Sequence, residues 1–103
     1  MQLDSKEVCR VFPWVRELWL FASPDPGSAS LDLLVVSAIP PRQVGPGQRK
    51  RLLVELQGQS PQQLDLRLTT RDQLAKWLAR GGRFATRFRR QAVKLFERPT
   101  DDS

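Results

Sequence analysis

Residues 31–36 (LDLLVV) constrain this chain most, because they are apolar at every position except Asp32. A strand that faces water on one side alternates apolar and polar residues, whereas a strand covered on both faces is apolar throughout. This run therefore predicts a strand that is buried on both faces of its sheet. Residues 64–69 (LDLRLT) alternate strictly instead, which is typical of a strand with only one face in the core.

Hydrophobic periodicity and breaker residues divide the rest of the chain into short helices and strands. We expect helices over residues 4–12, 48–57 and 71–80 and around Phe84 and Phe88, strands over residues 15–21, 31–36, 64–69 and 92–96, and a loop at 39–47. Because helices and strands mix along 103 residues, the sequence predicts a single α+β domain, a small mixed β-sheet with helices packed on it. This domain would span residues 1–98, and residues 99–103 would form a polar tail.

The last predicted helix has one apolar side and one basic side. Phe84 and Phe88 are four residues apart, so they share a helix face that we expect to lie inward. We expect Arg87, Arg89 and Arg90 on the outer face.

The absence of certain residue types excludes several chemistries. The chain has no His, no Tyr and one Cys. Catalytic triads that use His, His-based metal sites, Tyr nucleophiles and intrachain disulfides are therefore impossible within this chain. Any reaction would depend on carboxylates, hydroxyls, Lys or Arg, backbone amides or a bound metal.

Basic charge is concentrated in the later part of the sequence. The chain has 17 Lys and Arg against 11 Asp and Glu, a formal net charge of +6. Residues 42–103 contain fourteen of the basic residues and six of the acidic ones. Basic surfaces favour polyanions such as a nucleotide, a nucleic acid or an acidic protein face, and the alternative is a solvated Arg-rich surface.

No targeting or membrane segment is evident in the sequence. The first twelve residues include Asp4, Lys6, Glu7 and Arg10, so they lack the apolar core of a signal peptide. The longest apolar stretch, residues 31–41, is too short to span a bilayer. We therefore expect a cytoplasmic protein with no membrane partner.

Two acids lie within the predicted apolar strands. Asp32 and Asp65 are each the second residue of a Leu-Asp-Leu triplet. A carboxylate on an apolar strand is costly to bury unless it is paired, hydrogen-bonded or bound to a metal. If the two strands are neighbours, both carboxylates can face one cleft and bind Mg²⁺ through oxygen. The alternative is an acid that faces solvent or pairs with Arg67.

The sequence around the first acid resembles a known family. Residues 18–27 (LWLFASPDPG) and 29–36 (ASLDLLVV) resemble the minimal nucleotidyltransferase domains of the DNA polymerase beta superfamily. That family has a strand ending in Phe-Gly-Ser, a second Gly, the motif Ser-Asp-x-Asp-Leu-x-Val, and a third Asp on a later strand, where Asp65 lies here. The resemblance covers roughly residues 5–98 and implies a nucleotidyltransferase-like fold.

The resemblance also implies roles for individual residues. Asp32 and Asp65 would be the catalytic and metal-binding acids, and Ser23, Gly27 and Ser30 would bind the nucleotide. Mg²⁺ and ATP would be the cofactors of an active member. The sequence departs from the family at two positions: Ala22 replaces the first Gly, and Ser30 replaces the first of the three acids.

Three functions remain open after this comparison of motifs. The first is a degenerate nucleotidyltransferase-like protein that acts by binding a partner, as an antitoxin binds a HEPN-type toxin. The second is an active Mg²⁺-dependent enzyme that transfers AMP from ATP to a protein hydroxyl. The third is a basic module that binds nucleic acid.

Overall fold

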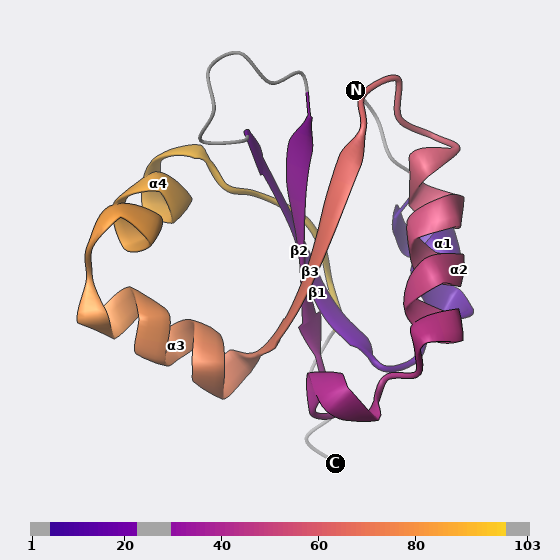
Figure 1. The fold of residues 1–103 in the computed structure, drawn as a ribbon, viewed down its shortest axis with the longest axis horizontal. Helices are drawn as coiled ribbons and strands as arrows, with labels where there is room; N and C mark the ends of the chain where they lie inside the picture. Colours follow the sequence, from indigo (N-terminus) through magenta and orange to yellow (C-terminus); the bar gives the residue numbers. More distant parts are fainter. Residues whose placement is uncertain (1–4, 23–29, 99–103) are drawn as a thin grey trace.

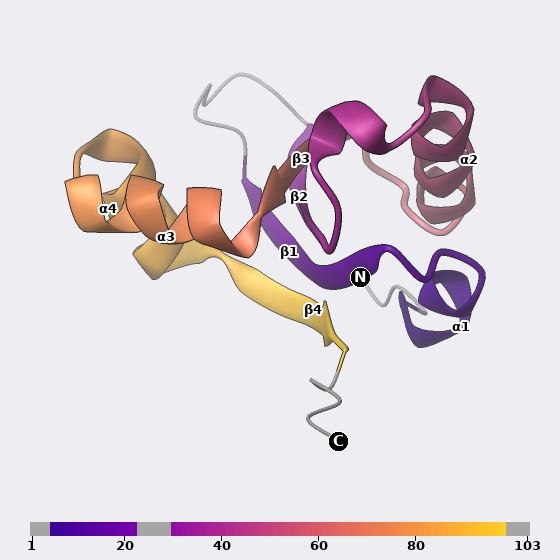
Figure 2. The ribbon, with the colours of Figure 1, turned by 90° about the horizontal axis from the view of Figure 1, so that it is seen from below.

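A four-stranded mixed sheet forms the centre of the computed structural model, which describes residues 5–22 and 30–98 (Figure 1). The strands are β1 (Val15–Ala22), β2 (Leu31–Ser37), β3 (Leu64–Thr70) and β4 (Val93–Glu97). Their spatial order is β3-β2-β1-β4. β1 is antiparallel to both β2 and β4, whereas β2 is parallel to β3. Figure 2 shows β4 at the edge of the sheet, beyond β1.

Helices cover both faces of this sheet. The helices are α1 (Ser5–Arg10), α2 (Pro46–Gln57), α3 (Arg71–Arg80) and α4 (Arg83–Gln91), and the 3-10 turn η1 (Pro41–Gln43) precedes α2. α1 and α2 lie on one side of the sheet, and α3 and α4 lie on the other (Figure 1). The predicted α+β fold, a small mixed sheet with helices packed on it, is therefore confirmed.

The two helical layers have different cores. We call the side with α1 and α2 the aliphatic layer and the side with α3 and α4 the aromatic layer. Buried residues of the aliphatic layer are Val8, Cys9, Phe12, Val15, Leu18, Leu33, Val35, Leu52, Leu56 and Leu64. The aromatic layer contains Phe21, Leu34, Val36, Leu74 and Phe88, with Trp19, Trp77 and Phe84 partly buried beside them.

β2 contributes to both cores, as its apolar sequence predicts. Successive side chains of a strand point to opposite faces. Leu33 and Val35 pack into the aliphatic layer, while Leu34 and Val36 pack into the aromatic layer. All four are at most 2% exposed, so this strand is buried on both faces.

Some element boundaries differ from those predicted. The first helix ends at Arg10, because the amides of Val11 and Phe12 bond to carbonyls only three residues back, which is a tighter turn. α2 begins at Pro46, earlier than predicted, since a proline at the first helical turn loses no hydrogen bond. The predicted tail at 99–103 lies outside the described residues. Within the described residues, no helix is long and apolar enough to cross a membrane.

Candidate functional site

The structure places the two strand acids next to each other. Asp32 and Asp65 are direct partners in the register of the parallel strands β2 and β3. Residues opposite each other in a parallel pair project from the same face of the sheet. Asp32 shares its face with Leu34 and Val36, so both acids lie on the side of the aromatic layer. The condition set by the sequence, that the two strands be neighbours, is met.

The two acids have different surroundings. Asp32 is buried, at 4% exposure, whereas Asp65 is exposed. Asp32 Oδ2 accepts a hydrogen bond from Arg87 Nη2 of α4 at 3.4 Å, and the two groups form an ion pair. The counter-charge of Asp32 is therefore Arg87, and not Arg67, which the sequence suggested as a possible partner.

The prediction that Arg87 lies on the outer face of its helix was wrong. Its side chain is 24% exposed, and its guanidinium carbon lies 4.9 Å from the ring centre of Phe21. A buried carboxylate needs a counter-charge, and a guanidinium over an aromatic ring gains a cation–π contact. Both interactions hold the Arg87 side chain against the sheet. Helical periodicity alone does not predict them, because both partners lie on other elements.

The described residues do not make up the three-acid metal site that the resemblance implies. All three of its positions are described, and they hold Ser30, Asp32 and Asp65. They supply two carboxylates, one of which is paired with Arg87. Among the residues described, no group of three or more His, Cys, Asp or Glu side chains could hold a metal ion. Ser23 and Gly27, predicted to bind nucleotide, lie outside the described residues.

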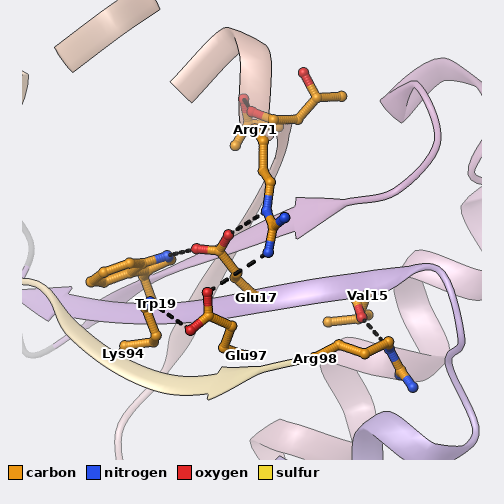
Figure 3. Close-up of polar contacts among 9 residues, drawn as sticks. Val15, Glu17, Trp19, Arg71, Lys94, Glu97 and Arg98 are labelled. Carbon is orange, nitrogen blue, oxygen red and sulfur yellow. Dashed lines mark hydrogen bonds and ion pairs between the residues drawn. The ribbon is translucent and has the colours of Figure 1, made fainter. Parts of the chain in front are cut away.

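A second polar cluster, which sequence reasoning missed, centres on Glu17 of β1 (Figure 3). This glutamate is 7% exposed. Its carboxylate accepts hydrogen bonds from Arg71 Nε at 2.8 Å and from Trp19 Nε1 at 2.9 Å. Arg71 Nη2 also lies 3.7 Å from Glu97 Oε2. Because Arg71 is the first residue of α3, these contacts attach the start of that helix to β1 and β4. The available signal was a single acid among the aromatic residues of β1.

Arg98 joins the end of the described chain to its beginning. Its Nε donates to the carbonyl of Val15 at 3.0 Å, and its Nη2 donates to the carbonyl of Cys9 at 2.8 Å. Burial raises the pKa of the Cys9 thiol to about 11, and the positive charge of Arg98 opposes part of that rise. Cys9 is fully buried in the aliphatic layer.

The aromatic layer also carries the basic charge of the molecule. Residues 71–91, which span α3 and α4, contain seven Lys and Arg and one acid. This excess equals the formal net charge of the whole chain, +6. Five of the cations are exposed, namely Lys76, Arg80, Arg83, Arg89 and Arg90.

Comparison with known proteins gives a likeness in fold. No family model matches the sequence, and no curated protein matches it. The chain is similar in structure to a chain of the crystal structure of the toxin-antitoxin MntA-HepT, with a TM-score of 0.51 and 19% sequence identity. This similarity covers 95% of the present chain and 71% of the other.

A mutant of the same toxin-antitoxin gives a similar result. Its TM-score is 0.52 at 18% identity, and the match covers 95% of this chain and 73% of that chain. At such low identity the similarity establishes the fold. The α+β architecture expected from the sequence is thus shared with a chain of a solved toxin-antitoxin structure.

Proposed function

We propose that this protein acts by binding a partner protein, in the manner of an antitoxin, and that the partner is a helical HEPN-type toxin. The fold similarity to a chain of the toxin-antitoxin MntA-HepT supports this proposal at the level of the fold. The main observation in its support is the ion pair between Asp32 and Arg87, because this pairing favours a binding role over a catalytic role for the two strand acids.

The ion pair favours binding over nucleotidyl transfer. A carboxylate that holds Mg²⁺ must present its oxygens to the cation. At Asp32 a guanidinium already supplies the positive charge, at 3.4 Å from Oδ2. A divalent cation approaching this carboxylate would meet Coulomb repulsion from Arg87. Ser30, in place of the first acid, adds no negative charge that would offset this repulsion.

The basic surface of α3 and α4 is the face that we assign to the partner. An interface that pairs opposite charges gains specificity and a faster encounter. The exposed cations of these helices outnumber their single acid, Asp72. The corresponding partner surface would be acidic.

Binding to the protein encoded by the neighbouring reading frame tests this proposal. We expect the two proteins, when co-expressed, to co-elute from a size-exclusion column. The double variant Arg83→Glu/Arg90→Glu should weaken the complex at least about tenfold, because it reverses two charges on α4. The double variant Lys50→Glu/Arg51→Glu makes the same charge change on exposed positions of α2 and should bind within about twofold of the original protein. Equal losses in both variants, or no complex at all, would contradict the proposal.

The alternative function, transfer of AMP from Mg²⁺·ATP to a protein hydroxyl, is favoured by the alignment of Asp32 with Asp65. Incubation of the complex with labelled ATP and Mg²⁺ discriminates between the two functions. Under our proposal neither protein becomes labelled. Label on the partner that disappears in both Asp32→Ala and Asp65→Ala would establish the transferase instead.

A further inference from the structure

A cavity of about 320 Å³ lies between the sheet and the helices of the aromatic layer. Its walls include three arginines from three different elements, Arg67 of β3, Arg80 of α3 and Arg87 of α4. Three aromatic rings also line it, namely Phe21, Trp77 and Phe84. We call this cavity the arginine pocket.

The charge of the pocket is unbalanced. Neither Asp32 nor Asp65 lines it, and its lining includes no acid. Within the described part of the chain, Arg67 and Arg80 form no ion pair, whereas Arg87 is paired with Asp32. Arg67 and Arg80 are exposed to solvent, so their positive charges remain available to attract an anion that enters the pocket. The arrangement therefore favours a negatively charged ligand.

Arg87 retains an unused donor. Its Nε is enclosed by protein and has no hydrogen-bond acceptor among the described residues. A buried donor without an acceptor costs free energy, so such atoms are rare in folded proteins. Arg87 lines the arginine pocket, so an anion bound there would supply the missing acceptor if the side chain turned its Nε toward the pocket. Guanidinium groups suit phosphate and carboxylate oxygens, because their planar geometry allows two parallel hydrogen bonds.

The aromatic walls add a second requirement. Phe84 lies edge-on to both Trp77 and Phe21, with ring centres 5.5 Å and 6.2 Å apart. Aromatic rings bury flat apolar groups well, and a pocket of this size lies near the lower end of the range for small-molecule sites, about 300 to 1,000 Å³. The ligand therefore combines a ring with an anionic group.

We propose that the arginine pocket binds a small aromatic anion, a ring that carries one phosphate or one carboxylate. The ring packs among Phe21, Trp77 and Phe84, and the anionic group binds the three guanidinium groups. This site requires no metal, and it is formed by residues of this chain without the protein partner.

Titration calorimetry on the full chain, at constant ionic strength, tests the site with four probes. The probes are phenyl phosphate, benzoate, inorganic phosphate and phenol. We expect phenyl phosphate or benzoate to bind at least about tenfold more tightly than either inorganic phosphate or phenol, because only the joined molecule satisfies both halves of the pocket. The preferred member of the first two probes identifies the anionic group.

Substitutions locate the bound probe. Arg67→Gln and Arg80→Gln should each weaken binding about tenfold, since each removes charged hydrogen bonds. Arg90→Gln is the matched control, because Arg90 is exposed on α4 and does not line the arginine pocket; it should leave the affinity unchanged. Phe84→Leu should reduce the advantage of phenyl phosphate over inorganic phosphate. Melting temperatures of all variants verify that they remain folded.

Three results would overturn the proposal. Equal affinities for phenyl phosphate and inorganic phosphate would indicate an adventitious ion only. An equal loss in Arg90→Gln would indicate general attraction to the basic helices. Binding that requires Mg²⁺ and disappears in Asp32→Asn, while Arg80→Gln leaves it unchanged, would place the ligand at the acid pair instead.

Discussion

The two sides of the sheet are stabilised by different interactions. In the aliphatic layer, Leu33, Val35 and Leu52 are fully buried. In the aromatic layer, the sheet presents two buried carboxylates, Glu17 and Asp32, each paired with an arginine from a helix. One layer is thus held by apolar burial, whereas the other combines aromatic contacts with ion pairs.

This difference separates stability from function within a small protein. Apolar burial is the main favourable term in folding, and the aliphatic layer contains most of the fully buried side chains. The aromatic layer contains the acid pair, the arginine pocket and the exposed cations of α3 and α4. Changes on the first side should therefore affect folding most, and changes on the second should affect binding.

Two neighbouring leucines of β2 provide the sharpest test of this separation. Leu33 faces the aliphatic layer at 0% exposure, while Leu34 faces the aromatic layer at 2% and borders the arginine pocket. We expect Leu33→Ala to lower the free energy of unfolding by about 3 to 5 kcal/mol, near the upper end for such substitutions. Leu34→Ala should cost only about 2 kcal/mol, because a side chain beside a cavity has fewer packing contacts to lose. Urea denaturation followed by Trp fluorescence measures both values.

The comparison of the two leucines has a clear contrary outcome. If Leu34→Ala costs as much as Leu33→Ala, the aromatic layer is packed as tightly as the aliphatic layer. The arginine pocket would then not be open in solution. Leu53→Ala, at a partly buried position of α2, is a control that should cost less than Leu33→Ala.

Glu17 tests how far ion pairs stabilise the aromatic layer. Glu17→Ala leaves Arg71 and the indole N–H of Trp19 without the carboxylate that both contact. We expect a loss of about 2 kcal/mol in the free energy of unfolding, because Arg71 is 37% exposed and water replaces part of the interaction. Glu97→Ala is the matched control, since its contact with Arg71 is longer, at 3.7 Å, and exposed; it should cost less than about 0.5 kcal/mol. Similar losses for Glu17→Ala and Glu97→Ala would contradict a central role for Glu17.

The fold could be predicted well from local patterns. The apolar run of β2 predicts cover on both faces, and this is confirmed. In β3 the alternation places the leucines against the aliphatic layer as predicted, but Thr69 on the opposite face is also buried, at 2% exposure. Gly81 ends α3 with a positive φ of 76°, a conformation that glycine adopts readily. These features depend on residues close together in the sequence.

The candidate site was harder to predict, because it depends on contacts between distant residues. The sequence identified Asp32 and Asp65 but not the arginine that pairs with Asp32, which lies 55 residues further along the chain. It also missed Glu17 and Arg71, separated by 54 residues. A counter-charge can come from any element that packs nearby, so periodicity within one helix does not reveal it.

The two strand acids provide a matched pair for the next prediction. Asp32→Asn removes the charge that pairs with Arg87, whereas Asp65→Asn alters an exposed side chain at the same level of the sheet. We expect Asp32→Asn to lower the free energy of unfolding by about 1 kcal/mol and Asp65→Asn to change it by less than about 0.5 kcal/mol. Chemical denaturation at pH 7 measures the difference. An increase in stability on replacing Asp32 would show that the carboxylate is costly to bury, as expected of an acid kept for metal binding.

Cys9 tests whether the aliphatic layer is sealed from water. Burial raises the pKa of its thiol from 9.0 to about 11, so the folded state favours the neutral thiol. The resulting stability is fully present below pH 9 and is lost as the pH rises through about 11, because the unfolded chain releases the proton first. At pH 7 we therefore expect ionisation of the thiol to contribute nothing to the free energy of unfolding. This is the smallest of the four expected effects near neutrality. Comparison with Cys9→Ala cancels the contributions of other titrating groups. The difference in unfolding free energy between the original protein and this variant should be constant below about pH 9 and should decline above it.

Chemical labelling provides a second measurement. A thiol reagent at about pH 8 should label Cys9 only after addition of denaturant. Rapid labelling of the folded protein, with no pH dependence of the stability difference, would mean that water reaches this core as readily as it reaches the aromatic layer.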